Sequence, residues 1–271
     1  MTVQRQTPAV RPASAVTQAD DLVEVAPGLR TLLRDEGQGR VVVLLHGTPF
    51  DVRAWDPLVG ALGGRCRTVR FDARGHGTAT AVPVADYRQL AIDVVAVLDR
   101  LDIDDAHVVG HSWGGQIAQQ VALDHPQRVN RLSLLCTRAS PFPAFAPVVA
   151  GLRDGTTDKE ASLARWFSPD ELAEPDSVAV AGRAWLRGAD PHRWAEALEM
   201  ISTFDVLDRL HRVSAPTDVV AAELDGVAVP DHMAQIADAL PDASFRVVTG
   251  TRHLLPLQHP AEIARIVEDR R

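Results

Sequence analysis

Short, wholly apolar runs alternate along this chain with stretches whose apolar residues recur at helical spacing. The clearest run, residues 41–45, is Val-Val-Val-Leu-Leu. A strand with no polar position has to be buried on both faces, as in a parallel sheet that helices cover. Similar runs lie at 68–71, 106–109, 132–135 and 219–222. A hairpin at 23–25 and 31–33 is expected before them. Strands that alternate with helices predict βαβ units, and hence an α/β fold with a mostly parallel sheet.

Helices are predicted between the apolar runs. The stripe that defines the first helix consists of Leu90, Val94, Val97, Leu98 and Leu101. Asp86 stands in front of it, where an N-cap belongs. A second helix is expected over 116–123, and two more begin at Pro230 and Pro260, since proline is favoured in a first turn.

One long stretch, 140–210, interrupts this rhythm. It has no strand-like run but several helical patterns separated by prolines. We therefore expect a helical cap inserted between two strands of one sheet, with 21–139 and 211–271 forming the core. Residues 1–20 are polar and aperiodic, which predicts a loose N-terminal arm.

The charge and the composition of the chain exclude some classes of binding partner. The chain has 28 basic and 36 acidic residues, a net charge of −8. This balance argues against nucleic acid and against an anionic membrane surface as partners. No apolar stretch approaches the roughly 18 residues of a membrane span, and no signal-peptide core is visible near the N-terminus. We expect a soluble, cytoplasmic protein, and a homodimer is a possible assembly.

The cysteines exclude two further classes. Cys66 and Cys136 are the only ones, and neither has the spacing of a metal-ligand pair. A disulfide framework and a cysteine-based zinc site are both ruled out. We expect two buried, reduced thiols and no metal.

The strongest chemical signal is a G-x-S-x-G pattern formed by Gly110, Ser112 and Gly114. It follows the predicted strand at 106–109 and precedes the predicted helix at 116–123. A serine on such a sharp strand-to-helix turn is strained, and small neighbours avoid clashes there. Ser112 is therefore the candidate nucleophile.

A second turn follows the first buried strand, where the sequence reads His-Gly-Thr-Pro at 46–49. The backbone N–H of Thr48 can point at the same place as that of Trp113, the residue after the serine. Two such donors would hold a tetrahedral oxyanion. Without Ser112, this segment would be read as an ordinary glycine turn.

A nucleophilic serine needs a base, and the base needs a carboxylate. Of ten histidines, His253 lies in the loop before the last helix, at the predicted sheet edge of Ser112. Asp225 follows the strand at 219–222 and is the preferred acid, with Glu223 and Asp231 as lesser candidates. The resulting chain order, serine then aspartate then histidine, is one of three known orders for such a triad.

With these residues the chain resembles the α/β-hydrolase family from about residue 22 onward. The turn at 46–49, the Asp-Ala-Arg-Gly-His-Gly loop at 72–77 and the serine turn match family motifs. The resemblance is greatest to 3-oxoadipate enol-lactonases and related small-ester hydrolases, at 71–77, at 124–129 and around Trp166. The sequences at 46–49 and 110–113 depart from those lactonases and are typical of the wider family, which leaves the particular lactone open.

Several residues have a structural as well as a functional interpretation. Asp72, Arg74 and His76 are expected to fix their loop by hydrogen bonds and ion pairs rather than to react. Trp166, like the other tryptophans of the cap, either lines the substrate cavity or packs in the cap. Arg138 either meets an anionic group of the substrate or forms a surface ion pair.

Together these features predict a cofactor-free enzyme that hydrolyses a small ester or lactone. Three alternatives stay open on the sequence. The same residues could cleave a C–C bond or carry out perhydrolysis, or they could transfer an acyl group in a biosynthetic thioesterase or cyclase. The protein could also be a ligand receptor that hardly turns over, because a fold does not guarantee an activity.

Overall fold

The computed structural model describes residues 22–175 and 178–269. The arm expected at 1–20 lies outside these ranges. None of the helices in the described part has the length and apolarity needed to cross a membrane.

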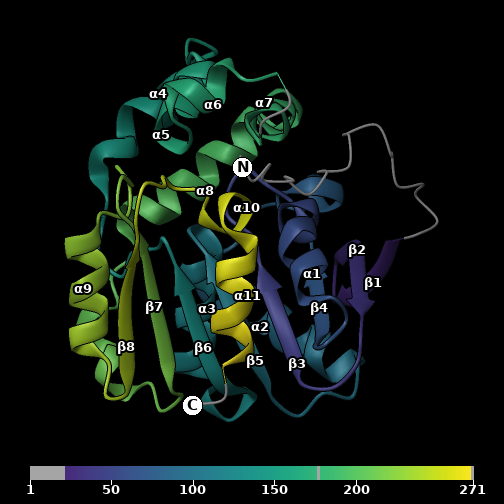
Figure 1. The fold of residues 1–271 in the computed structure, drawn as a ribbon. Coiled ribbons are helices and arrows are strands. Elements are labelled where there is room, and N and C mark those ends of the chain that lie inside the picture. The colour runs from purple at the N-terminus through teal and green to yellow at the C-terminus, as the bar shows by residue number, and fades with distance from the viewer. Residues whose placement is uncertain (1–21, 176–177, 270–271) are drawn as a thin grey trace.

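Within the described residues, one sheet of eight strands runs through the molecule in the order β1-β2-β4-β3-β5-β6-β7-β8 (Figure 1). The strands are β1 (Leu22–Ala26), β2 (Leu29–Glu36), β3 (Val41–Leu45), β4 (Arg67–Phe71), β5 (Ala106–His111), β6 (Val129–Leu135), β7 (Thr217–Ala222) and β8 (Ala243–Val248). The pairs from β4 to β8 are parallel, and β1 and β2 add an antiparallel edge. The predicted α/β fold and its N-terminal hairpin are both confirmed.

Most residues of the central strands are apolar because both faces of these strands are buried. Every residue of β5 and β7 is buried, because helices cover both faces of the sheet there. At the edge of the sheet, β8 alternates instead, and Phe245 and Val247 are 41% and 40% exposed. Burial is therefore continuous along the central strands of the sheet and alternates along its edge strand β8.

The helices that flank this sheet in the described residues are α1 (Asp56–Leu62), α2 (Tyr87–Arg100), α3 (Trp113–Asp124), α9 (Pro230–Ala239) and α11 (Pro260–Glu268). In Figure 1, α11 lies in front of the sheet and α2 and α3 lie behind it. As expected, Asp86 caps α2, accepting the N–H of Gln89 at 2.9 Å. Short 3-10 turns occur at Val52–Trp55, Gly77–Ala79, Pro126–Arg128, Pro143–Phe145, Lys159–Ser162 and Leu207–Arg212.

Between β6 and β7 the described chain forms helices and loops only. The α-helices are α4 (Ala146–Asp154), α5 (Leu163–Trp166), α6 (Pro169–Ala173), α7 (Ala179–Gly188) and α8 (Pro191–Thr203). Figure 1 shows them above the carboxyl ends of the strands, with the short α10 (Leu255–Gln258) beneath α8. The division into a core and a cap at 140–210 stays a prediction, and it agrees with this helical segment.

Glycine is required where α3 begins, because backbone passes there at contact distance. A Cβ on Gly114 would lie 2.1 Å from the carbonyl oxygen of Leu45 at the end of β3. A Cβ on Gly110 would lie 2.4 Å from the carbonyl oxygen of Gly114. The two glycines of the serine motif therefore let α3 approach the edges of β3 and β5.

This close approach predicts a large stability cost for Gly114→Ala. The new methyl group can be accommodated only by moving α3 away from β3, so we expect a loss of about 3 kcal/mol in the free energy of unfolding. Gly60→Ala is the matched control, because Gly60 lies in α1 with open space around it. It should be neutral or stabilising by up to about 1 kcal/mol. Urea denaturation of both variants measures the difference, and equal stabilities would contradict the packing argument.

Candidate active site

Ser112 occupies the turn between β5 and α3 in a conformation that residues with a side chain rarely adopt. Its φ is 54° and its ψ is −119°. Hydrogen bonds on both sides hold it there. Its N–H donates to the carbonyl of Leu135 at 2.9 Å, and its carbonyl accepts from the Thr137 hydroxyl at 2.6 Å. The hydroxyl of Ser112 is thereby presented to the cavity above the sheet.

His253 and Asp225 come to Ser112 from loops far away in the sequence. His253 lies between β8 and α10, and its Nε2 is 2.9 Å from the Ser112 Oγ. Its Nδ1 is 2.7 Å from an oxygen of Asp225, which follows β7. The structure thus brings together the three residues that the sequence selected, in one continuous chain of hydrogen bonds.

Asp225 is held as an ionised acceptor. Burial alone would raise the pKa of its carboxyl, but the charge and hydrogen bond of His253 and the N–H groups of Val227 and Ala228 outweigh it and lower the pKa. These two N–H groups lie 2.7 Å and 3.0 Å from the second carboxylate oxygen. The ionised Asp225 accepts a hydrogen bond from Nδ1–H of His253. The Nε2 atom of His253 is then free to accept a hydrogen bond from the hydroxyl of Ser112.

The two lesser acid candidates lie elsewhere. Glu223 is exposed, and its carboxylate accepts the N–H of Gly250 at 2.8 Å. Asp231 is an exposed residue in the first turn of α9. Among the three acids considered, the structure therefore places Asp225 in contact with His253.

His111 has a part in this arrangement that the sequence did not reveal. It precedes Ser112 in the chain, and its Nε2 donates to the backbone carbonyl of His253 at 2.7 Å. Burial lowers the pKa of His111 to about 3, so the ring is neutral. It holds the loop that carries His253. Its position next to Ser112 is the only sequence signal that could have suggested this contact.

Thr48 and Trp113, the expected oxyanion donors, both line the cavity that contains Ser112. Trp113 opens α3, where a backbone N–H has no acceptor within the helix. The hydroxyl of Thr48 lies 2.8 Å from Nε2 of His76. Burial lowers the pKa of His76 to about 3, and its Nδ1 faces the carbonyl of Arg74 at 2.9 Å. The neutral His76 therefore accepts from Thr48 and fixes its rotamer.

The loop that carries His76 is tied down as the sequence predicted. The Asp72 carboxylate accepts the N–H groups of Val52 and Thr78, each at 2.8 Å. Arg74 and the buried Asp93 form a bidentate ion pair at 2.6 Å and 2.8 Å. These contacts confirm the loop-fixing interpretation for Asp72 and Arg74.

The cavity over Ser112 is small and largely apolar. It encloses about 30 Å³ of space that the centre of a water molecule can occupy. Its apolar wall comes mainly from the helices between β6 and β7: Phe145, Trp166, Trp194, Leu198 and Ile201. Trp166 therefore lines the cavity. Trp185 does not belong to its lining and instead donates its indole N–H to Asp51 at 3.0 Å.

Arg138 also lines this cavity, and the alternative of a surface ion pair is wrong for it. The side chain is buried, with 6% of the residue exposed. Its Nη1 donates to the carbonyl of Val227 at 2.9 Å and to Nδ1 of His232 at 2.6 Å, and its guanidinium lies over the ring of Phe142. The guanidinium of Arg138, just past the end of β6, therefore lies inside the protein rather than in solvent.

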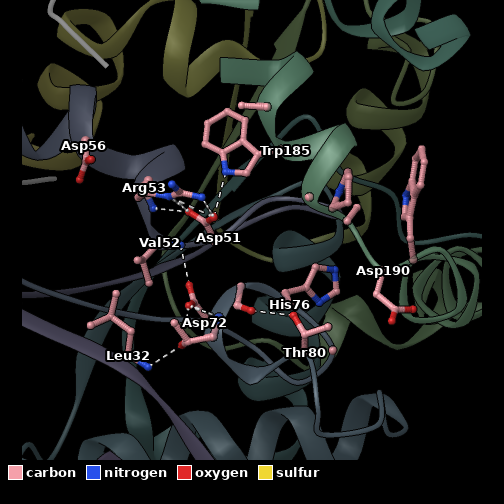
Figure 2. Close-up of a pocket in the computed structure, with 18 of the residues that line it drawn as sticks. Leu32, Asp51, Val52, Arg53, Asp56, Asp72, His76, Thr80, Trp185 and Asp190 are labelled. Atoms are coloured by element: carbon pink, nitrogen blue, oxygen red, sulfur yellow. Dashed lines mark hydrogen bonds and ion pairs between the residues drawn. The ribbon is translucent and has the colours of Figure 1, made fainter. Parts of the chain in front are cut away.

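A larger cavity of about 280 Å³ lies beside the first, between the 49–80 segment and helices α7 and α8. Figure 2 shows Arg53 and Trp185 both turned toward Asp51 in its wall. Arg53 pairs with Asp51 at 2.5 Å, and the same carboxylate accepts from Trp185. Ser112 is absent from its lining, so the hydrogen-bonded serine points to the smaller cavity. No cluster of three or more potential metal ligands occurs among the residues that the structure describes.

A serine on a strained turn at the carboxyl edge of a mostly parallel sheet is the arrangement of an α/β-hydrolase. Comparison with known sequences agrees, because the model of the "Alpha/beta hydrolase family" matches residues 42–266. The chain belongs to this family.

Relatives with assigned activities cover almost the whole chain. It is 30% identical over 250 residues to the pimeloyl-(acyl-carrier protein) methyl ester esterase of Aeromonas hydrophila, covering 86% of this chain and 95% of that protein. It is 26% identical over 229 residues to 3-oxoadipate enol-lactonase 1 of Acinetobacter baylyi, with 83% and 86% covered. The crystal structure of the enol-lactonase from Burkholderia xenovorans LB400 matches with a TM-score of 0.83 at 26% identity, over 90% of this chain and 97% of that one.

The resemblance inferred from the motifs is therefore confirmed, and the protein is an enzyme of the α/β-hydrolase family.

The contact between Asp225 and His253 predicts which acidic residue the catalytic activity depends on. Asp225→Asn keeps the shape of the site but favours the wrong tautomer of His253, so kcat on an activated ester should fall on the order of 10⁴-fold. Glu223→Gln and Asp231→Asn, the matched controls, should stay close to the parent enzyme. Steady-state kinetics with p-nitrophenyl acetate measures all three. A greater loss in Glu223→Gln would show that the acid lies two residues earlier.

Proposed function

We propose that the protein is a serine hydrolase that cleaves a small ester or lactone through an acyl-enzyme on Ser112. The observation that carries this proposal is the chain of hydrogen bonds from Ser112 through His253 to Asp225, at 2.9 Å and 2.7 Å, opening into a small cavity. The Nε2 atom of His253 faces the hydroxyl of Ser112, as a general base must.

In the first half of the reaction, the Ser112 Oγ attacks the substrate carbonyl while His253 takes its proton. The N–H groups of Thr48 and Trp113 hold the negative charge of the tetrahedral oxygen. When the tetrahedral intermediate collapses, the C–O bond to the leaving alkoxide breaks and His253 returns the proton to that oxygen. A lactone opens in the same step, since its leaving group stays attached to the acyl chain.

In the second half, a water molecule attacks the acyl-enzyme. His253 takes a proton from the water and then gives it to the Ser112 oxygen as the carboxylic acid departs. Asp225 keeps Nδ1 protonated and stabilises the imidazolium in both halves. His111 holds the His253 loop by its backbone, and none of these steps calls for a cofactor.

The cavity indicates a compact substrate. Its wall of tryptophan, leucine and isoleucine side chains favours an apolar acyl or alcohol portion, and Trp166 and Arg138 are the residues that we propose to touch it. The helical segment at 140–210 would act as its roof. Location in the cytoplasm and assembly as a homodimer stay predictions.

Replacement of the nucleophile tests the proposal directly. Ser112→Ala should lose on the order of 10³-fold or more in kcat while the fold is kept, because only the attacking oxygen is removed. A serine-directed phosphonate should add its mass to the parent enzyme and leave Ser112→Ala unmodified. Full ester turnover by the alanine variant would refute the mechanism, and an unreactive parent enzyme would favour the ligand-receptor alternative.

The roof of the cavity predicts a limit on substrate size. Activity on p-nitrophenyl esters should be highest for short acyl chains and fall as the chain outgrows the space beneath Trp166 and Trp194. Values of kcat/KM for acyl chains of increasing length measure this, with product masses recorded to distinguish hydrolysis from other acyl transfers. Equal rates on long-chain esters would mean that the helices do not close the site.

A further inference from the structure

The sheet ends at β8, and no other strand in the described residues pairs with the outer edge of this strand. β8 is the last strand in the sheet order and pairs with β7 alone. The backbone carbonyls of Asp242 and Val248 accept hydrogen bonds from the β7 side. Because successive residues of a strand direct their backbone groups to opposite sides, the N–H and C=O groups of Ala243, Phe245 and Val247 point away from β7. These groups are available to a further strand.

The same three positions carry exposed apolar side chains. Phe245 and Val247 are exposed to about the same extent as each other, and Ala243 is exposed as well. Natural proteins commonly protect an edge strand with a proline, a bulge or a charge at such positions. β8 has no proline and a regular register with β7, and its charged residue, Arg246, lies on the other face of the strand. An apolar edge of this kind is suited to pairing with another chain.

A second copy of β8 fits this edge best in one antiparallel register. With Phe245 opposite Phe245 of the second copy, Ala243 lies opposite Val247, and all three residues of each copy exchange backbone hydrogen bonds. A shift of two residues in one direction would place Val247 opposite Pro241, which has no N–H to donate. The same shift in the other direction would place Arg246 opposite Arg246 of the second copy, and like charges directly opposite are destabilising.

Charges on the other face of β8 favour the same register. Arg246 and the exposed Asp242 form no ion pair in the part of the chain that the structure describes. In the register centred on Phe245, Arg246 of each copy lies diagonally across from Asp242 of the other. Side chains at this diagonal start about 7–8 Å apart, which an arginine can span. Two-fold symmetry forms the contact twice, so the charges of the two copies are complementary.

We propose that the protein associates with a second copy of itself through β8, so that the two sheets join into one sheet across a two-fold axis. The surface is self-complementary, as a two-fold interface requires, because each copy supplies the same donors, acceptors and charges. Phe245 packs against its equivalent at the axis, with Ala243 and Val247 on either side. Ser112, His253 and Asp225 of each copy lie together in one chain, so this proposal does not depend on the proposed function.

Cysteine cross-linking tests the surface and the register together. In the proposed dimer the two copies of residue 245 form a hydrogen-bonded pair with Cα atoms about 5.5 Å apart, a distance that a disulfide spans. Phe245→Cys should therefore give a disulfide-linked dimer on mild oxidation, which a reducing agent reverses. Ala243→Cys and Val247→Cys are the matched controls and should stay monomeric on a denaturing gel. Each of these positions lies more than about 13 Å from its own equivalent in this register.

The parent protein should form no disulfide-linked dimer either, because Cys66 and Cys136 are buried. Equal cross-linking of all three cysteine variants, or none in Phe245→Cys, would overturn the proposal.

Charge reversal at the diagonal contact is a second test. A strand pair of this length makes a small interface, so sedimentation of the parent protein at about 100 µM should show a reversible dimer. Arg246→Asp should raise the dissociation constant about tenfold, since it places two carboxylates at each diagonal. Adding Asp242→Arg should restore the value of the parent protein. Arg187→Asp, at an exposed position of α7, is the matched control and should change nothing. A parent protein that stays monomeric, or a double variant as weak as Arg246→Asp alone, would contradict the proposed interface.

Discussion

The strained backbone of Ser112 is the constraint on which the site depends. With φ at 54°, the chain leaves β5 and enters α3 within one residue, and the serine hydroxyl stands above the carboxyl edge of the sheet. This turn is possible only because Gly114 lets α3 touch the end of β3. The hydrogen bonds from Ser112 to Leu135 and from Thr137 to Ser112 then tie the turn to β6 and its following loop. The strained conformation of Ser112 is thus maintained by its contacts with β3, β6 and the loop after β6.

Hydrogen bonds to neutral, buried histidines position the reactive groups around this turn. His111 donates to the backbone of His253, and His76 accepts from the hydroxyl of Thr48. Burial keeps both rings uncharged, with pKa values of about 3, so they do not compete with His253 for a proton. The loops that carry the candidate base and one candidate oxyanion donor are therefore fixed by groups whose charge does not change in the working range of pH.

The electrostatics of the cavity divide into two regions. Around Asp225 a buried negative charge is satisfied by His253 and two backbone N–H groups. Beneath the helices, positive charge and unpaired donors face an apolar wall without an acidic partner among the described lining residues. The first region suits proton transfer.

Much of the fold could be predicted because short stretches of the sequence have patterns that are typical of one secondary structure. The unbroken apolar runs identified the central strands, and the glycines around Ser112 identified the strained turn. Helix α1 escaped prediction, since its seven residues are too short to show a periodic stripe. The chain order of Ser112, Asp225 and His253 followed from their positions after β5, β7 and β8, whose carboxyl ends meet at one edge of a parallel sheet.

What the sequence by itself determined is therefore the strands, the turn and the residues at their ends. The tertiary structure alone decided that Arg138 turns inward and that Gln116 and Arg165 share its cavity. A side chain's direction depends on contacts between segments far apart in the chain, such as the hydrogen bond between Asp225 after β7 and His253 after β8. No local pattern encodes such contacts, because each forms only when the sheet has brought the distant segments together.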